Sequence, residues 1–176
     1  MVLVDRRKDM DRVGAEQIGT GEAPLSDGEL FEFIELLFFA YRDFISDPDE
    51  ILKAFGFGRA HHRVLHFVSR NPGMRVTELL DILKITKQSL ARVLRQLIEE
   101  GYVEQREGQE DRRRRLLYAT DKGATLAARL AAPQLRRIAA ALSLAGQDAQ
   151  APAREFLYSL INERERAAVR ALISRV

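Results

Sequence analysis

The chain has 176 residues, of which 46% are hydrophobic and 31% charged, a composition typical of a soluble globular protein of one domain, or of one domain with a dimerisation extension. It has no cysteine, which excludes disulfides, thiolate nucleophiles and cysteine-based zinc sites. No apolar run approaches the roughly 20 residues of a membrane span, and the N-terminus is charged from Asp5 onward, so we expect a cytoplasmic protein with no membrane partner.

The N-terminal part combines a polar segment with a strongly apolar helix. Residues 1–25 lack apolar periodicity and are predicted to be a flexible arm, and Ser26 with Glu29 predicts a capping box that opens a helix. The apolar stripe of this helix is Leu30, Phe33, Ile34, Leu37, Tyr41, Phe44 and Ile45, widened by Phe31, Phe38 and Phe39. Such a wide stripe indicates either a deeply buried helix or a helix shared between the core and a dimer interface.

Turn and cap residues divide the next part of the chain into short helices. Asp47 as cap, Pro48 at the first helical position and Gly56 as stop predict a separate short helix. A further helix is predicted at about 59–70, and another at 76–84. After a tight turn, Thr86 caps a helix that Gly101 terminates.

The helix that follows Thr86 has two opposite faces. Leu90, Val93, Leu94, Leu97 and Ile98 form its apolar side. Gln88, Arg92 and Arg95 form the other side, and these side chains match adenine and guanine edges in the major groove of DNA. The first helical turn, with its free N–H groups, favours phosphate. The predicted DNA-binding residues here are therefore Thr86, Lys87, Gln88, Ser89, Arg92 and Arg95.

Two alternating segments, "YVEQREG" and "RRRLLYA", predict a β-hairpin whose tip and returning strand carry four consecutive arginines. Helix, turn, helix and hairpin together are the layout of a winged helix-turn-helix. Arg112, Arg113, Arg114 and Arg115 are therefore predicted to bind the minor groove or the DNA backbone, although alternation along the strand lets only some of them do so together. Asp111 is expected to orient Arg113, which leaves Arg112 and Arg114 facing the DNA.

The last third of the chain is predicted to be helical. Thr120 caps a helix that runs to about Ala145, with a kink or break at Pro133, and "GQDAQAP" is predicted to be a loop. Asn162 and Glu165 indicate a new helix start near the C-terminus.

The stretch that contains the predicted helix-turn-helix and hairpin resembles the MarR family of dimeric winged-helix regulators. The wing pattern of that family is matched by the spacing of Asp111, Arg113, Thr120 and Gly123, and the preceding "TKQSLARVLRQLIEEGYVEQRE" is similar to its recognition helix. Two departures are Ala119, where the family has leucine, and residues 145–152, which look like an insertion.

The resemblance implies a mainly α fold with a small β-hairpin wing and N- and C-terminal dimerisation helices. Its expected parts are an arm at 1–25, a dimerisation helix region at 26–56, a winged helix-turn-helix at 57–123 and dimerisation helices at 124–176. It further implies a homodimer on a pseudo-palindromic operator of double-stranded DNA, acting usually in repression, and a small-molecule effector between the dimer helices and the DNA-binding lobe.

All three histidines, His61, His62 and His66, fall on one predicted helix. His62 and His66 are spaced to share a metal, but a set of local hydrogen bonds or a pocket lining is the simpler interpretation. The candidate effector pocket consists of Phe38, Tyr41, His62 and His66, which are otherwise core residues.

The sequence contains no Gly-rich phosphate loop, nucleophile elbow or suggestive carboxylate pair, so we expect no enzyme activity, no cofactor and no dedicated metal site. Two alternatives to a DNA-binding regulator stay open. One is a winged-helix module that binds an acidic protein, and the other is a metal or pH sensor acting through the histidine helix.

Overall fold

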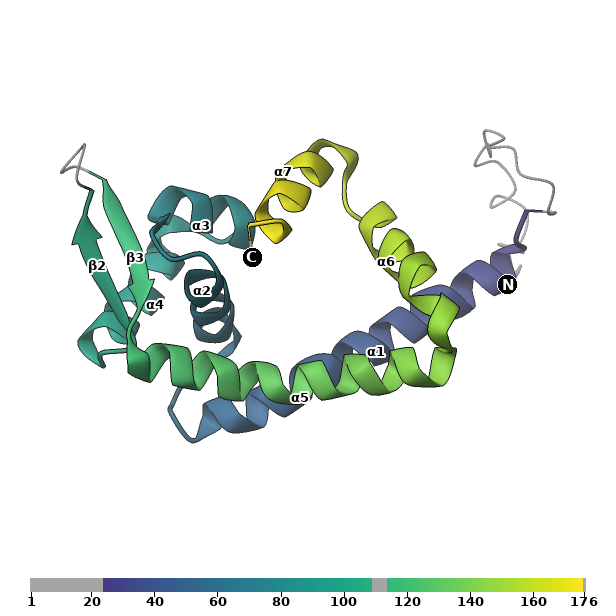
Figure 1. Ribbon diagram of the computed structural model, residues 1–176, viewed down its shortest axis with the longest axis horizontal. Coiled ribbons are helices and arrows are strands. Elements are labelled where there is room, and N and C mark those ends of the chain that lie inside the picture. Colours follow the sequence, from purple (N-terminus) through teal and green to yellow (C-terminus); the bar gives the residue numbers. More distant parts are fainter. Residues whose placement is uncertain (1–23, 109–113, 176) are drawn as a thin grey trace, which may run out of the picture. The chain divides into compact units, whose positions relative to one another are not determined.

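The computed structural model describes residues 24–108 and 114–175 and shows a mainly helical chain with one small antiparallel sheet, as predicted (Figure 1). The elements in chain order are α1 (Asp27–Lys53), α2 (Arg59–Arg70), β1 (Met74–Arg75), α3 (Val76–Leu83), α4 (Lys87–Glu99), β2 (Val103–Glu107), β3 (Arg115–Ala119), α5 (Asp121–Ala145), the 3-10 turn η1 (Gln147–Ala149), α6 (Gln150–Ser159) and α7 (Glu163–Ile173). The chain divides into two compact units inside α1, after Leu37, and every tertiary contact below lies within Phe38–Val176. Residues 1–23, which make up nearly all of the expected arm, lie outside the described residues.

The first helix begins where the sequence predicts. The Ser26 amide donates to the Glu29 carboxylate at 2.8 Å, and the Glu29 amide donates to Ser26 Oγ at 3.4 Å, which completes the capping box. At the other end, Gly56 adopts the left-handed conformation with φ 66°, which a glycine reaches without steric cost. The predicted start is therefore confirmed, whereas the helix ends at Lys53, three residues before Gly56.

The predicted break at Asp47 is wrong, because α1 runs continuously to Lys53 with Pro48 inside it. A proline within a helix leaves the carbonyl four residues earlier without its usual N–H partner, and here that carbonyl belongs to Phe44. The side-chain amide of Gln134 donates to the Phe44 carbonyl at 3.3 Å, and Pro48 is itself buried. The helix therefore tolerates the proline through a bond from α5, which no local sequence pattern reveals.

A three-residue connection joins α3 to α4 and gives the helix-turn-helix its shape. Lys84 ends α3 in the left-handed region, with φ 51°, and Ile85 and Thr86 complete the connection. Thr86 Oγ1 accepts from the Ser89 amide at 3.1 Å and so caps α4, as predicted. Gly101, with φ 74°, follows the end of α4.

The sheet has three strands in the order β1-β3-β2, all antiparallel. The predicted hairpin is present, with Val103 opposite Ala119 and Glu107 opposite Arg115. The sequence analysis missed β1, because two residues are too few to show alternation. This strand pairs Met74 with Leu117 and anchors the wing to the start of α3.

Two predictions about the C-terminal helices need correction. α5 is a single helix through Pro133, so no break occurs there. The expected loop at residues 146–152 is instead the 3-10 turn followed by the start of α6, where Pro152 lies in the first turn and its missing N–H has no intrahelical partner to lose. Asn162 precedes α7 as predicted, but its side chain makes no capping bond.

One hydrophobic core holds the winged-helix region together. Ile98 was expected on the apolar side of α4 but is 36% exposed, because it lies one residue beyond the stripe that faces α2. Leu172 of α7 packs against the core at its edge. The buried apolar residues are Leu52, Phe57, Val64, Leu65, Val68, Met74, Leu79, Leu83, Leu90, Val93, Leu94, Leu97, Tyr102, Val103, Leu117, Leu126 and Leu130.

Candidate nucleic-acid interface

The exposed side of α4 carries the side chains that the sequence predicted there. Leu90, Val93, Leu94 and Leu97 are buried, and this fixes which face of the helix points to solvent. Gln88, Arg92 and Arg95 are exposed and line one surface recess. Lys87 is exposed in the first turn, beside the Thr86 cap.

The cations of this face have no acidic partners. Within residues 24–108 and 114–175, Lys87, Arg92 and Arg95 form no ion pair with any carboxylate. Their positive charge is therefore compensated only by solvent and counterions. A polyanion that displaces those counterions gains free energy from their release.

A hydrogen-bond chain anchors α4 to α2 and gives a role to a histidine that the sequence analysis did not separate from its neighbours. The Gly58 amide donates to His61 Nδ1 at 3.1 Å, so Nε2 carries the ring proton and donates to Gln96 Oε1 at 2.9 Å. The Gln96 amide in turn donates to Glu100 at 2.9 Å. The His61 ring also stacks on Phe57, with centroids 4.7 Å apart. His61 thus sets the position of the recognition helix, a role visible only once α2 and α4 are side by side.

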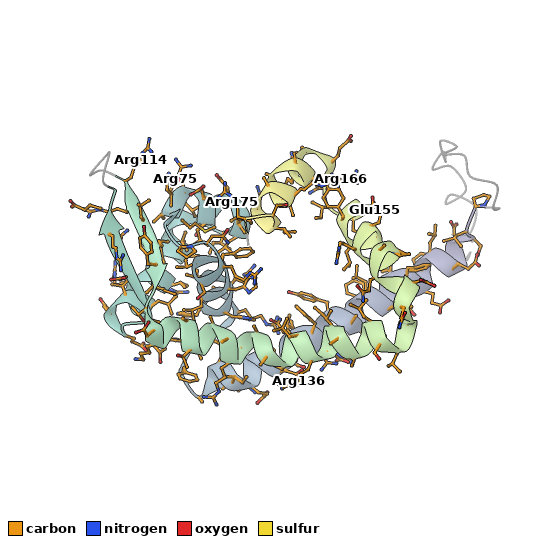
Figure 2. The ribbon with its side chains drawn as sticks, viewed as in Figure 1. Arg75, Arg114, Arg136, Glu155, Arg166 and Arg175 are labelled. Carbon is orange, nitrogen blue, oxygen red and sulfur yellow. The ribbon has the colours of Figure 1, made fainter. Side chains whose placement is uncertain are left out.

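The described part of the wing is partly neutralised by its own acids. Arg115 pairs with Glu107 across the hairpin at 3.1 Å, and Arg106 pairs with Glu104 and lies over the Tyr118 ring. Arg114 is exposed beside the wing tip (Figure 2). Arg112 and Arg113, together with Asp111, lie outside the described residues, so their predicted roles stay predictions.

The root of the wing is joined tightly to α4 and α5. The Thr120 hydroxyl donates to the Gly101 carbonyl at 2.7 Å and accepts from the Gly123 amide at 3.1 Å. Lys122 Nζ donates to the Glu100 carbonyl at 2.7 Å. Gly123 leaves no room for a side chain, because a Cβ there would lie 1.9 Å from the Tyr102 carbonyl oxygen. The end of α4, the start of the first wing strand and the start of α5 are therefore linked by direct hydrogen bonds and close packing.

Ala119 at the wing root stands where the family pattern has leucine. Ala119 is partly buried against the core and pairs with Val103.

The candidate effector pocket of Phe38, Tyr41, His62 and His66 stays a prediction. Phe38 and Tyr41 are 70% and 58% exposed, so they are not core residues of this chain either. His66 lines a cavity with residues of α3 and α7, and none of the other three lines it. Desolvation lowers the pKa of both His62 and His66, which favours their neutral forms. Across the described ranges, no group of three or more metal-ligating side chains accompanies them.

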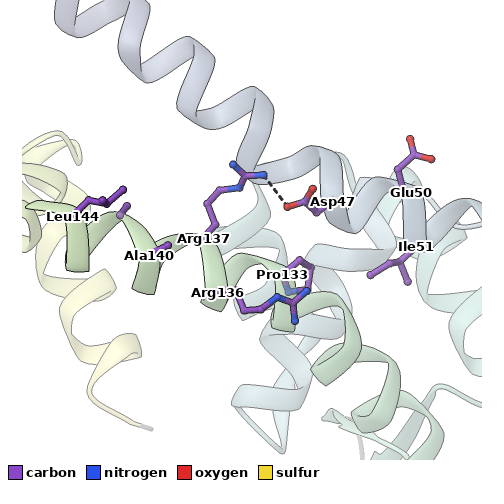
Figure 3. A pocket seen from close by; sticks show the side chains of 9 residues that line it. Asp47, Glu50, Ile51, Pro133, Arg136, Arg137, Ala140 and Leu144 are labelled. Carbon is purple, nitrogen blue, oxygen red and sulfur yellow. Dashed lines mark hydrogen bonds and ion pairs between the residues drawn. The ribbon is translucent and has the colours of Figure 1, made fainter.

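A second cavity lies between α1 and α5 (Figure 3). An ion pair of 2.9 Å between Arg137 and Asp47 crosses its rim, and Arg136 extends along the same stretch of α5. The sequence analysis missed it because its walls are 90 residues apart in the chain. None of the described helices is long and apolar enough to cross a membrane.

Some known proteins resemble this chain in sequence, and others resemble it in fold. A family profile described as "MarR family" matches residues 55–114. The HTH-type transcriptional regulator PetP of Rhodobacter capsulatus is 49% identical over 138 residues, which cover 78% of this chain and 83% of PetP. A MarR-family regulator from Listeria monocytogenes, solved with a 26mer DNA, superposes with a TM-score of 0.62 at 19% identity, covering 77% of this chain and 89% of its own. Streptococcus pneumoniae FabT, solved in complex with DNA, superposes with a TM-score of 0.61 at 18% identity, covering 74% of this chain and 94% of its own.

Proposed function

This chain belongs to the MarR family of transcriptional regulators, and from that premise we propose that it binds a pseudo-palindromic operator as a homodimer, represses transcription there, and is released by a small-molecule effector. Members of the family are DNA-binding regulators and not enzymes. The observation that carries the proposal is the exposed face of α4, where Gln88, Arg92 and Arg95 point to solvent and the two arginines have no acidic partner among the described residues.

The proposed contacts follow from the chemistry of that face. Arginine donates to guanine O6 and N7 in the major groove, and glutamine pairs with the adenine edge. We assign Gln88, Arg92 and Arg95 to the bases, and Thr86, Lys87 and Ser89, around the N-terminus of α4, to phosphates.

The wing arginines 112–115 are assigned to the minor groove or the backbone. Arg115 can contact DNA only after its pair with Glu107 opens.

The homodimer is supported by the apolar surface that the flanking helices leave open. Monomeric proteins rarely expose contiguous apolar patches beyond a few hundred Å², and larger patches mark interaction surfaces. Two copies that joined these helices would bury the apolar face and place one recognition helix at each half-site. The exposed large residues of these helices are Leu30, Phe31, Phe33, Ile34, Leu36, Leu37, Phe38, Phe39, Tyr41, Leu135, Ile138, Leu144, Phe156, Leu157, Leu160 and Ile173.

Fluorescence anisotropy with DNA from upstream of the coding region, against scrambled competitor, tests the DNA-binding proposal. We expect the logarithm of the binding constant to fall with the logarithm of salt concentration by about 0.9 for each phosphate neutralised. Arg92→Ala should cost about 1–3 kcal/mol and relax base preference, whereas Arg112→Ala should weaken all sequences alike and reduce the salt slope by about one unit. Arg154→Ala, which removes an exposed cation on α6, is the matched control and should change neither quantity. Equal binding to upstream and scrambled DNA would favour the protein-binding alternative.

Sedimentation velocity tests the dimer separately. Phe38→Ser removes an aromatic side chain that is 70% exposed on α1 and should weaken self-association. Ile98→Ser, an exposed apolar site on α4, is the control and should leave the dimer intact. A wild-type protein that sediments as a monomer at micromolar concentration would contradict this part of the proposal.

A further inference from the structure

A cavity of about 660 Å³ lies between α2, α3 and α7, away from the exposed face of α4. Ligand sites commonly occupy about 300–1,000 Å³ and combine an apolar lining with a few polar groups. Its apolar walls come from all three helices and from β1, and they include Phe67, Met74, Ile82, Ala168, Val169 and Leu172. The cavity therefore has the size and the lining of a site for a small organic molecule.

The third wall, α7, is attached to the winged-helix region near both of its ends. Lys84 Nζ lies 3.2 Å from Glu165 Oε1, and Arg175 lies 3.8 Å from Glu78 Oε1. Figure 2 shows Arg175 at the end of the chain beside α3. These pairs and the packing of Leu172 attach α7 to the core, so residues of this chain form all the walls that the structure shows.

Most of the charged groups around the cavity are paired. Glu165 pairs with Lys84, and Glu78 pairs with Arg175 and, at 3.2 Å, with Arg75. Asp81 makes no hydrogen bond or ion pair with any residue in 24–108 or 114–175. His66 lines the same cavity, and desolvation followed by the nearby Arg70 lowers its pKa, which favours its neutral form. Among the described residues, Asp81 is therefore the carboxylate of the cavity that no cation neutralises.

We propose that this cavity binds a small organic cation, with its apolar body between α2, α3 and α7 and its ammonium group paired with Asp81. A cation with an apolar body of aromatic size fits within the cavity and can pair with this carboxylate, whereas an anion would meet Asp81 as a like charge. The site differs from the expected pocket of Phe38, Tyr41, His62 and His66, of which it contains only His66.

The cavity is connected to the recognition helix through Lys84. This residue lines the cavity, pairs with Glu165, and ends α3 in a left-handed conformation before the connection into α4. A bound cation that changes the Lys84–Glu165 pair therefore acts where the orientation of α4 is set. This step deepens the effector part of the proposed function and rests on it, whereas binding of the cation itself does not.

Isothermal titration of the full chain with three probes of equal apolar body tests the site: 4-phenylbutylamine, 4-phenylbutanol and 4-phenylbutyrate. We expect saturable binding of the amine at one site per chain, about tenfold tighter than binding of the carboxylate. Asp81→Asn should remove the preference for the amine, and since Asp81 is exposed the variant should fold normally. Ala168→Trp should fill the cavity and abolish binding of all three probes. Asp148→Asn, an exposed carboxylate in the 3-10 turn, should bind like the wild type.

The inference is overturned if binding of the amine does not saturate, or if Asp81→Asn still binds the amine more tightly than the carboxylate. It is also overturned if Ala168→Trp leaves the affinity for the amine unaltered and changes only self-association. Operator anisotropy with and without the amine separates the two proposals. A protein that binds the amine but shows no sequence preference on DNA retains the site and loses the proposed function. A protein that prefers its operator but binds no amine retains the proposed function and lacks the site.

Discussion

Apart from Pro48, all the buried apolar side chains of the described residues lie between Leu52 and Leu130. The large exposed ones, except Ile98, lie before Leu52 or after Leu130. The stretch from Leu52 to Leu130, which includes the winged helix-turn-helix, therefore buries its own apolar surface. The flanking parts of α1 and α5, together with α6 and α7, have apolar faces of similar composition that stay in contact with solvent.

The difference shows that one chain contains two kinds of amphipathic helix. α4 has its apolar stripe filled by α2 and the sheet, so its exposed face is polar and available for a polyanion. α1 carries a wide apolar stripe whose large side chains are exposed. Because leaving apolar surface in water costs about 25 cal/mol per Å², such a stripe favours association, and this is the physical basis for the proposed dimer.

The largest expected effect follows from a substitution in the core of the winged-helix region. Leu65→Ala removes a side chain that is 0% exposed and should lower the free energy of unfolding by about 2–5 kcal/mol. Leu157→Ala, at a site 58% exposed on α6, is the matched change outside that region and should cost less than about 0.5 kcal/mol in the monomer. Urea unfolding at low protein concentration measures both. Equal losses would mean that the two regions do not differ in the way the exposures indicate.

The second prediction concerns the wing root, where the core and the DNA-binding surface meet. Gly123→Ala should cost about 1–3 kcal/mol, because its Cβ would lie 1.9 Å from the Tyr102 carbonyl oxygen and the backbone would have to shift. It should also weaken DNA binding, because a backbone shift at the wing root would change the position of the wing relative to α4. Gly28→Ala is the control in the first turn of α1, where the nearest atom is 3.9 Å away, and it should be neutral or slightly stabilising. If thermal unfolding showed no loss for Gly123→Ala, the close approach at the wing root would be disproved.

Much of this contrast could be predicted from the sequence because it rests on local patterns. The Ser26 and Thr86 caps, the glycine stops and the exposed positions of Gln88, Arg92 and Arg95 all depend on residues within a turn or two of one another. Their local geometry follows from helical periodicity and capping chemistry, which a single sequence displays. The assignment of these residues to DNA contacts remains a prediction.

The features that the sequence analysis missed all depend on distant segments. Pro48 was expected to start a helix, because no local pattern shows that the Phe44 carbonyl accepts instead from Gln134, 90 residues further along the chain. The pairing of β1, the His61–Gln96 bond and the cavity closed by α7 likewise require the tertiary structure. Charge runs are ambiguous for the same reason, since only the hairpin register shows that Arg115 faces Glu107.

The third prediction tests the hydrogen bond from Gln134 to the Phe44 carbonyl, which lies one turn before Pro48 in α1. Gln134→Ala removes the donor to the Phe44 carbonyl and should cost about 1 kcal/mol. The same change in a Pro48→Ala background should cost less, because the new amide at position 48 can bond that carbonyl itself. A double-mutant cycle by urea unfolding measures the coupling. Purely additive losses would show that Gln134 stabilises the chain in some other way.

The smallest expected effect is a pH dependence that belongs to the winged-helix region alone. Desolvation is the main cause that lowers the pKa of His62 and His66 on α2, so the folded chain favours their neutral forms more than the unfolded chain does. The unfolded chain then takes up protons first, near the usual histidine value of about 6.5. The contribution to stability is present above that pH and is lost as the pH falls below it. The double variant His62→Gln, His66→Gln should show a shallower loss of unfolding free energy between pH 7.5 and 5 than the wild type, measured by urea titration. Identical slopes in the two proteins would show that these rings are as well solvated in the folded chain as in the unfolded one, and that the edge of the core at α2 is more open than the structure indicates.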